Sequence, residues 1–407
     1  MKISEAIRFV PFYLYNYLTR NKIYKKMNHI DENISDIYDY AIKNVPFYMR
    51  NKTFPIINKQ IIQDNLNDFI SNDYDKDELI KTTTSGSYGT PSTFYRNKDK
   101  KINQITDVLI FGRHNNYYFG VKHGFIRGIK KSKKSLFIQN EIHLDPQNLN
   151  QKAMEEYYIK LKKVNHIIGF PSVILNFIDF CEKFKLKRLT NISGVTCTAE
   201  PLTVEDRDKI SKFFNCPVLT RYASEEVGII ANRLPGETFY RVNNVSVKID
   251  IYKFDSDEKQ EDGLEGRIIV TDYYSHAMPL INYDTGDTGV METIIRDGVE
   301  IKCLKEITGR LVEHLYDEKD DLISPFAINV LLKDYQKIGQ FQFIQLDKAK
   351  YRLIVTGEID NTYKDEIITD LKKILGNNID LLIEQVYEIP SLKSGKRPYI
   401  RNEYKKE

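Results

Sequence analysis

Strand-like and helix-like segments alternate through the middle of this 407-residue chain, and this pattern most narrows the folds available to it. Apolar residues at intervals of three and four indicate helices, and short runs of β-branched and aromatic residues indicate strands. The alternation favours an α/β core. The predicted helices are 149–163, 201–214 and 361–375, and the predicted strands are 216–221, 242–253, 267–272 and 341–346.

Two local signals refine these predictions. Pro201 suits the first turn of its helix, where a backbone N–H is not needed. The polar stretch 253–265 separates two predicted strands and is expected to be a hairpin tip.

The length of the chain allows two or three domains, and the hydrophobic pattern changes near 309–313. Beyond that point a β–α–β pattern has hydrophobic periods of its own. We therefore predict an α/β (multidomain α+β) protein. A large body of β-sheets flanked by helices would occupy 1–309, and a small, mobile α+β domain 310–407.

Charge and hydropathy exclude several classes of protein. The 60 basic and 57 acidic residues nearly cancel, whereas a nucleic-acid-binding protein usually carries a concentrated basic face. No segment approaches the roughly 20 apolar residues that span a bilayer, and no secretory cleavage pattern is seen. We expect a cytoplasmic protein. The aromatic and basic segment 1–26 could rest on a membrane surface, but a helix packed on its own domain is favoured.

The cysteines and histidines argue against a metal held by the protein alone. The four cysteines are too far apart for a zinc or redox motif and suggest buried, unpaired thiols in a reducing compartment. The histidines form no HExxH-type array. The cysteines are Cys181, Cys197, Cys216 and Cys303.

Segment 82–91 (TTTSGSYGTP) is the first candidate for chemistry. Its glycines allow backbone N–H groups to turn toward an anion, and its hydroxyls add further donors, which suits a polyphosphate. It is not a Walker A loop, because no Gly-Lys-Ser/Thr ending follows. A plain flexible loop is the alternative.

Two later segments carry candidate charges. In 283–287 (YDTGD) Gly286 permits a tight turn that presents Asp287, whose carboxylate could accept both hydroxyls of a ribose; an ordinary β-turn is the alternative. In 394–397 (SGKR) Lys396 is a charge on a glycine-hinged loop that could approach a phosphate. The alternative is a solvated lysine.

The order of six motifs adds a family resemblance. The motifs are TSGSYGTP (84–91), AEPL (199–202), YASEE (222–226), YDTGD (283–287), GRLVE (309–313) and SGK (394–396). In this order they resemble the adenylate-forming superfamily of acyl-CoA synthetases and related ligases. Three further features resemble its phenylacetate–CoA ligase branch, which includes CapK-like proteins of capsular polysaccharide biosynthesis. They are GFPS (169–172), Arg207 after AEPL, and MPLINYDTGD (278–287).

The resemblance implies an ATP- and Mg²⁺-dependent ligase that forms an acyl-AMP from a small carboxylic acid. The acyl group would pass to the thiol of coenzyme A or of a carrier-protein phosphopantetheine, or to an amine. The implied phosphate loop contains Thr84, Ser85, Gly86, Ser87, Gly89 and Thr90. The other implied roles are the adenine pocket (Ala199, Glu200, Tyr222), the Mg²⁺ ligand (Glu226), the ribose contacts (Asp287, Arg310), the domain hinge (Glu313) and the catalytic lysine (Lys396).

Several positions depart from the family pattern. Glu225 stands where Thr or Ser is usual, which leaves the choice of metal ligand between Glu225 and Glu226 open. Ala223 replaces a glycine and Asn282 replaces a common arginine. Glu313 replaces the hinge aspartate, and the phosphate loop lacks its frequent lysine.

The acid-binding residues are the least defined. Segment 111–125 corresponds to a stretch that lines the acid pocket of related enzymes. Its His114, Tyr117 and Tyr118, together with Phe170, suggest an aromatic or polar acid; packed core aromatics are the alternative. A second reading is a catalytically degenerate nucleotide- or acyl-adenylate-binding scaffold of a biosynthetic complex. Retention of Lys396 argues against it, because a pure binder does not need that lysine.

Overall fold

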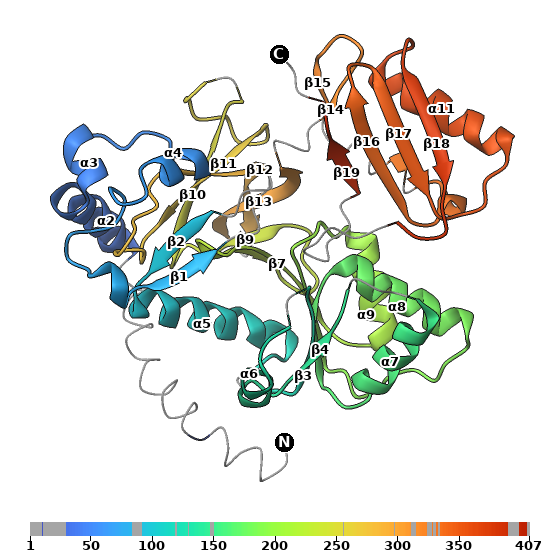
Figure 1. Cartoon of the computed structure of the whole chain (residues 1–407), viewed down its shortest axis with the longest axis horizontal. Coiled ribbons are helices and arrows are strands. Elements are labelled where there is room, and N and C mark those ends of the chain that lie inside the picture. The colour runs from blue at the N-terminus through green and yellow to red at the C-terminus, as the bar shows by residue number, and fades with distance from the viewer. Residues whose placement is uncertain are drawn as a thin grey trace. The chain divides into compact units, whose positions relative to one another are not determined.

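The computed structural model separates into two compact units, which are described here one at a time (Figure 1). The first comprises Met1–Thr285 and Val290–Glu306, and the second comprises Gly286–Gly289 and Ile307–Glu407. The structure describes residues 10, 30–83, 92–118, 120–128, 130–146, 150–254, 256–296, 298–310, 315–323, 328, 331–332, 334–389 and 399–404.

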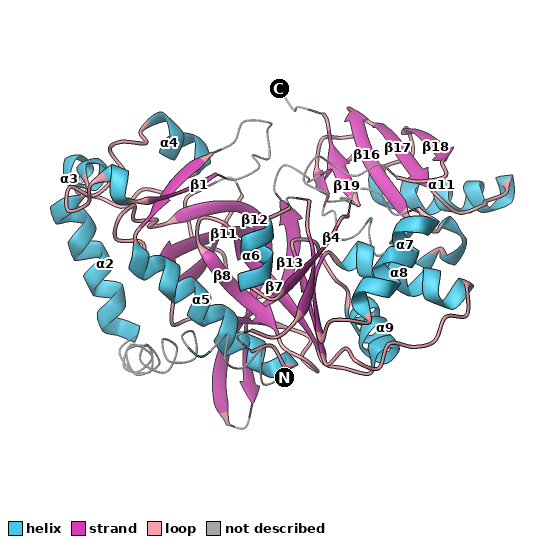
Figure 2. Ribbon diagram, turned by 60° about the horizontal axis from the view of Figure 1, so that its bottom comes forward, coloured by secondary structure: helices cyan, strands magenta, loops and turns pink. Residues whose placement is uncertain are grey.

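An eleven-stranded mixed sheet, in the order β10-β11-β12-β13-β9-β8-β7-β6-β5-β3-β4, forms the centre of the first unit (Figure 2). The five strands β4, β3, β5, β6 and β7 are parallel, and the pairs β7–β8, β8–β9, β9–β13 and β10–β11 are antiparallel. The strands are β3 (His123–Ile126), β4 (Glu141–Leu144), β5 (His166–Gly169), β6 (Gly194–Thr198), β7 (Val218–Ser224), β8 (Gly228–Arg233), β9 (Tyr240–Val242), β10 (Val247–Tyr252), β11 (Glu265–Asp272), β12 (Tyr283–Arg296) and β13 (Val299–Arg310).

Three helices cover one face of the parallel strands. They are α7 (Gln151–Leu161), α8 (Pro171–Lys183) and α9 (Val204–Phe214), and each directs an apolar stripe into a shared core. Ile167, Val195 and Val218 supply that core from the sheet. Successive side chains of a strand point to opposite faces, so the neighbouring residues on these strands face away from α7–α9.

The opposite face is met by α5 (Lys98–Gly112) and by the short helix η2 (Arg113–Asn115). Asn115 on η2 donates hydrogen bonds from Nδ2 to Val195 O at 2.8 Å and to Thr196 Oγ1 at 2.9 Å. Gly194 permits this contact, because a Cβ there would lie 1.8 Å from the Asn115 carbonyl oxygen. Helix α6 (Lys133–Ile138) packs near β4.

The N-terminal part of this unit contains α2 (Ile30–Asn44), α3 (Pro46–Asn51), α4 (Lys59–Asp64), η1 (Lys76–Glu78) and the antiparallel pair β1 (Ile80–Thr83) and β2 (Thr93–Arg96). The backbone of Ile57 is hydrogen-bonded on both sides of Tyr283: Ile57 N donates to Asn282 O at 3.1 Å, and Asp284 N donates to Ile57 O at 2.7 Å. This contact fixes the start of α4 beside the beginning of β12.

The second unit is a small α+β body with its own core. Its four-stranded sheet has the order β18-β17-β16-β19 and packs against α11 (Asn361–Leu375). The strands are β16 (Phe341–Asp347), β17 (Lys350–Val355), β18 (Asp380–Gln385) and β19 (Ile400–Asn402), with a hairpin of β14 (Leu315–Tyr316) and β15 (Leu322–Ile323) and a short helix η4 (Gln336–Ile338). β19 joins the edge of the sheet parallel to β16, with Ile400 opposite Phe343.

The predicted α/β class is confirmed, as are the three helices, the strands at 216–221, 267–272 and 341–346, and the hairpin between β10 and β11. The predicted strand 242–253 is instead divided into the end of β9 at Val242 and β10 from Val247. Pro201 is an exception. Helix α9 begins only at Val204, because Thr203 is its N-cap and accepts a hydrogen bond from Asp206 N at 3.2 Å. The predicted boundary at 309–310 and the mobility of the second domain stay predictions.

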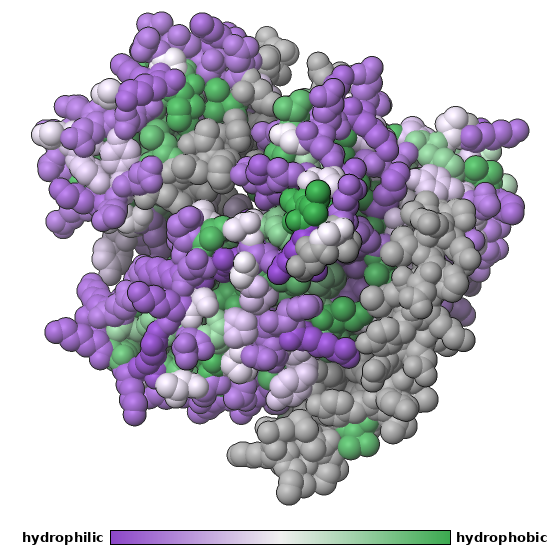
Figure 3. Space-filling view, turned by 180° about the vertical axis from the view of Figure 1, so that it is seen from behind, coloured by the Kyte–Doolittle hydropathy of each residue, from purple (hydrophilic) through white to green (hydrophobic). Residues whose placement is uncertain are grey.

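The four cysteines are buried and unpaired, as predicted. Within the described residues, every helix is too short or too polar to cross a bilayer. On the face shown in Figure 3, hydrophobic residues form small separate groups among hydrophilic ones. Of segment 1–26, expected to be a helix packed on its own domain with membrane contact as the alternative, only Val10 lies within the described residues.

Candidate functional site

Three of the sequence motifs follow the carboxyl ends of neighbouring parallel strands. GFPS begins at the end of β5, AEPL follows β6, and YASEE begins near the end of β7. Parallel strands bring their carboxyl ends to one edge of a sheet, where α/β proteins bind their ligands. The motifs, far apart in sequence, therefore converge on one edge of this sheet.

GFPS and AEPL are joined by a hydrogen bond. Ser172 N, in the first turn of α8, donates to Glu200 Oε2 at 3.1 Å. A carboxylate there satisfies a backbone donor that has no partner within the helix, and it interacts favourably with the helix dipole. Ala199 is exposed and has a φ of +70°, which turns the chain sharply after β6. Glu200 therefore binds the first turn of α8, in addition to its predicted role in the adenine pocket.

YASEE and YDTGD also meet. Tyr222 is half-buried on β7, and its hydroxyl donates to Thr285 Oγ1 on β12 at 3.4 Å. The Thr285 hydroxyl in turn donates to Ile268 O at 3.0 Å. This chain of hydrogen bonds fixes the Tyr222 ring beside the segment that carries Asp287.

The structure distinguishes Glu226 from Glu225, the two candidate metal ligands between which the sequence did not decide. Glu226 is 3% exposed, and its Oε1 accepts a hydrogen bond from Tyr283 Oη at 2.7 Å. Lys59 Nζ lies 3.3 Å from the same oxygen. The side chain of Glu225 is exposed instead. Among the described residues, Glu226 Oε2 has no hydrogen-bond or ion-pair partner.

This arrangement fits a magnesium ion that arrives with a nucleotide. Mg²⁺ in nucleotide sites is usually held by one or two carboxylates together with phosphate oxygens and water. Over the described part of the chain, no cluster of three or more His, Cys, Asp or Glu side chains could hold a metal by itself. Glu226 would therefore supply one oxygen, and phosphates and water the others.

A buried ion pair supports the turn that carries Glu226. Lys100 on α5 is 2% exposed, pairs with Asp272 and donates to Val227 O at 2.6 Å. Nearby Asp107 accepts from Ser246 and Asn243, each at 2.9 Å, and burial raises the pKa of its carboxyl to about 6. Lys59 and Lys100 could not be predicted, because isolated lysines in polar stretches are usually solvated.

Asp287 lies half-buried on β12. Gly286 has a φ of +75°, a conformation that favours glycine, but it lies within a continuous strand. The expected tight turn at YDTGD is therefore wrong, since β12 continues through the motif to Arg296. Arg310 is the last residue of β13.

Several predicted residues lie outside the described ranges. They are Thr84, Ser85, Gly86, Ser87, Gly89 and Thr90 of the phosphate loop, the hinge residue Glu313 and the lysine Lys396. Their roles stay predictions. The strands β1 and β2 flank the phosphate-loop segment, with Thr83 opposite Thr93.

The four predicted acid-pocket residues do not gather in one place. His114 and Tyr118 are exposed, whereas Phe170 is 7% exposed and belongs to the α7–α9 core. Tyr117 lies toward the opposite face of the sheet, with its ring centroid 5.1 Å from that of His166. Their common role stays a prediction.

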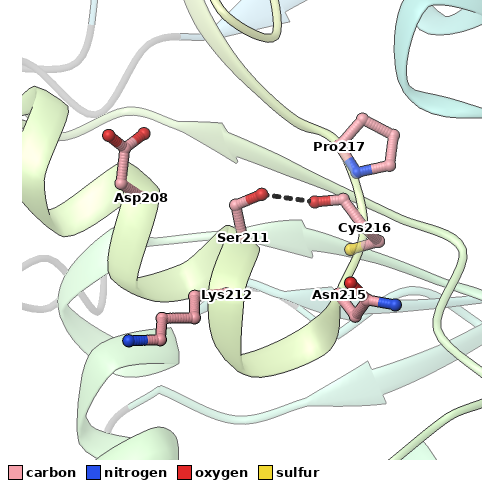
Figure 4. A pocket seen from close by; sticks show the side chains of 6 residues that line it. All are labelled: Asp208, Ser211, Lys212, Asn215, Cys216 and Pro217. Atoms are coloured by element: carbon pink, nitrogen blue, oxygen red, sulfur yellow. Dashed lines mark hydrogen bonds between the residues drawn. The ribbon is translucent and has the colours of Figure 1, made fainter.

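A surface cavity of about 470 Å³ lies elsewhere, at the C-terminal end of α9 (Figure 4). It is lined by Asp208, Ser211, Lys212, Asn215, Cys216 and Pro217. The Ser211 hydroxyl donates to Cys216 O at 2.8 Å across it. It contains none of the predicted site residues.

Solved structures with the same fold are adenylate-forming ligases. 2-Hydroxyisobutyryl-CoA ligase, in a complex with R3-HIB-AMP, has a TM-score of 0.74 at 13% identity, covering 92% of this chain and 89% of that one. ATP-bound MatB from Rhodopseudomonas palustris has a TM-score of 0.57 at 15% identity, covering 80% and 67%. The amide bond synthetase McbA from Marinactinospora thermotolerans has a TM-score of 0.56 at 14% identity, covering 78% and 67%. The chain has the fold of the adenylate-forming ligases.

Sequence comparison points to one group of these proteins. Residues 315–403 match the family described as the CapK C-terminal domain. Protein CapK of Staphylococcus aureus is 25% identical, and the match covers 92% of this chain and 89% of that protein. The chain is thus similar to CapK over most of its length, which confirms the resemblance seen in its motifs.

Proposed function

We propose that the chain is an ATP-dependent carboxylic acid ligase that forms an acyl-AMP, releases pyrophosphate and transfers the acyl group. The observation that carries this proposal is the convergence of GFPS, AEPL and YASEE at one edge of the sheet, with Tyr222 bonded to YDTGD. This edge is where an α/β fold binds a nucleotide. Complexes of 2-hydroxyisobutyryl-CoA ligase with an acyl-AMP and of MatB with ATP support it.

The residues have distinct roles in this mechanism. Tyr222 stacks on the adenine beside Ala199 and Glu200, and Asp287 with Arg310 accepts and donates hydrogen bonds at the ribose. Glu226 holds Mg²⁺, which when bound offsets the charge of the phosphates. Lys396 stabilises the charge that develops as the substrate carboxylate meets the α-phosphate. The second domain, hinged at Glu313, then withdraws Lys396 so that the acceptor can enter.

The acceptor is a thiol of coenzyme A or of a carrier protein, or an amine. 2-Hydroxyisobutyryl-CoA ligase is known in complex with coenzyme A, and McbA is an amide bond synthetase, so this fold serves both. The similarity to Protein CapK supports a place in polysaccharide biosynthesis, with secondary metabolism as the alternative. Four buried, unpaired thiols suit a reducing compartment such as the cytoplasm.

Pyrophosphate release across a panel of carboxylic acids, with ATP and Mg²⁺, tests the proposal directly. We expect at least one acid to support release, and Lys396→Ala to abolish it. A chain that binds ATP or an acyl-AMP analogue tightly but releases no pyrophosphate with any acid would instead be a nucleotide- or acyl-adenylate-binding scaffold.

A further inference from the structure

Polar side chains line the face of the sheet opposite α7–α9. His166, Thr196 and Arg221 alternate with the core residues of β5, β6 and β7 and therefore face η2 and α5. Arg221 pairs with Thr198 on one side and with Asn232 of β8 on the other. His166 Nε2 is 3.0 Å from Thr196 Oγ1, which also accepts from Asn115.

Many polar atoms of this cluster have no hydrogen-bond partner within the described part of the chain. Asn232, His166 and Asn115 are each 0% exposed. The unpartnered atoms are Asn232 Nδ2 and Oδ1, His166 Nδ1, Asn115 Oδ1 and Arg221 Nε. More than nine in ten buried polar groups in proteins are hydrogen-bonded, so such a concentration suggests that a bound polar molecule completes the cluster.

Arg221 decides what kind of molecule fits. It is half-buried, and its guanidinium forms no ion pair or hydrogen bond with the described residues. Burial lowers the pKa of its guanidinium, which Tyr117 partly opposes. His166 is neutral, because burial and the charges of His123 and Arg221 lower its pKa. The guanidinium of Arg221 is therefore a positive charge in this cluster that no carboxylate of the cluster neutralises.

Glu141 is a carboxylate on the same face of the sheet, but it is not the partner of Arg221. Glu141 of β4 lies in register with His123, which lies in register with His166. It is already paired with Arg127 and with Lys131, the latter at 3.2 Å. The unpaired fork of Arg221 matches the two oxygens of a carboxylate that comes from outside the protein.

We propose that Arg221, together with Asn232 and Tyr117, binds a second carboxylate on the substrate acid. The substrate is then a dicarboxylic acid, one end of which is adenylated while the other pairs with Arg221. Arg221 immediately precedes Tyr222, and its neighbour Thr198 immediately precedes Ala199, so the subsite lies at the same carboxyl edge of the sheet as the proposed adenine site. An uncharged aromatic acid such as phenylacetate would leave the guanidinium unpaired. This inference rests on the proposed ligase function.

Matched acids test the proposal. Succinate, glutarate and adipate are compared with butyrate, pentanoate and hexanoate in the pyrophosphate-release assay. We expect kcat/KM for at least one dicarboxylate to exceed that of its partner by about 10²-fold or more. Arg221→Met should lower this value about 10²- to 10³-fold, the usual effect of truncating one member of a buried charge pair. The kcat/KM values for the monocarboxylates and the KM for ATP should not change.

Three further variants distinguish loss of the subsite from damage to the fold. Arg50→Met removes an exposed arginine of α3 and should behave like the wild type. Asn232→Asp places a negative charge opposite Arg221 and should reduce dicarboxylate selectivity while sparing the monocarboxylates. If Arg221→Met does not fold, Asn232→Asp and Arg221→Lys test the subsite in its place. The lysine variant should retain part of the selectivity for dicarboxylates.

Binding measured without ATP tests the dicarboxylate subsite independently of the proposed ligase function. Calorimetry should detect a dicarboxylate bound to the wild type and not to Arg221→Met. If that holds but no acid releases pyrophosphate, the ligase function fails and the subsite stands. If monocarboxylates react as well as dicarboxylates, and Arg221→Met changes neither, water completes the cluster and the subsite is overturned while the ligase stands.

Discussion

The Tyr283 hydroxyl donates a 2.7 Å hydrogen bond to Glu226 Oε1, and so joins the turn after β7 to the start of β12. Tyr283 is fully buried, so the bond holds the Glu226 carboxylate in one orientation. The second oxygen is left for another partner. A carboxylate held in this way loses little freedom when it binds a metal ion.

Glu226, and not Glu225, is expected to bind the metal. Glu226→Gln should reduce ATP-dependent adenylation by at least about 10²-fold, because it removes a fixed negative charge beside the phosphates' counter-ion. Glu225→Thr, the matched change at an exposed side chain, should be tolerated or improve activity. Pyrophosphate release measures both, and the opposite ranking would show that the motif register is shifted by one residue.

Lys59 is expected to compete with Mg²⁺ for Glu226, because its ammonium lies 3.3 Å from Oε1. Lys59→Met should lower the Mg²⁺ concentration for half-maximal binding severalfold, and Lys59→Arg should not. Calorimetric titration of Mg²⁺ into the ATP-bound protein gives the affinity without turnover. Weaker binding in Lys59→Met would mean that Lys59 positions Glu226 or the phosphates instead.

Asp287 is expected to hold the ribose. Asp287→Ala should weaken ATP binding by roughly 1–3 kcal/mol, the cost of losing charge-assisted hydrogen bonds to two hydroxyls. The variant should then use deoxy-ATP almost as well as ATP, measured by competing the two nucleotides. Undiminished discrimination would assign the ribose contact to another residue.

Lys396 is expected to serve only the first half-reaction. Lys396→Ala should slow acyl-AMP formation about 10²- to 10³-fold, the usual effect of removing a preorganised charge at a developing anion. Supplied with synthetic acyl-AMP and the acceptor, the variant should transfer the acyl group at nearly the wild-type rate. Equal loss in both half-reactions would contradict the domain-swing mechanism, and no loss in either would leave Lys396 a solvated charge.

Glu141 is expected to make stability depend on pH. Burial raises the pKa of its carboxyl, but hydrogen bonds from His123 and Arg127 and the charges of Arg127 and Lys131 outweigh burial and lower the pKa to about 2. A lowered folded-state pKa stabilises the protein above the unfolded value near 4.5, and this stabilisation is lost as pH falls toward 2. Because Arg127 and Lys131 are partly exposed, screening limits it to about 1–2 kcal/mol.

Glu141→Gln tests this by chemical denaturation between pH 3 and 7. The variant should be less stable at pH 7, and its difference from the wild type should shrink as pH falls below about 4.5. Glu258→Gln, a change at an exposed surface pair, is the control. A difference that does not depend on pH would show that packing, and not charge, is responsible.

The elements that could be predicted are those whose signals are local. Helix α11 spans the predicted 361–375, because Asp360 caps it by accepting from Tyr363 N at 2.8 Å and its apolar residues keep a helical period. The same reasoning misplaced the start of α9 at Pro201, because the Thr203 cap was not recognised. The motif resemblance also implied roles for Tyr222 and Glu226, and those roles stay predictions.

The residues that could not be predicted depend on distant contacts. Glu200 meets Ser172 only because β5 and β6 are neighbours, and Lys59 meets Glu226 only because Ile57 pairs with Tyr283. Arg221 was visible as part of a predicted strand. That its guanidinium has no partner among the described residues follows only from the three-dimensional arrangement of the sheet face opposite α7–α9.

Strand β19 has a consequence for any shortened form of the protein. It follows segment 390–398 directly, while Ile389 on the other side of that segment is 2% exposed, so Lys396 lies between two anchored points of the chain. A protein cut after residue 398 would keep its lysine but lose one anchor, along with Ile400 from the core. Proteolytic clipping of a few terminal residues should therefore inactivate adenylation as completely as deleting the lysine, although every motif would remain in the sequence.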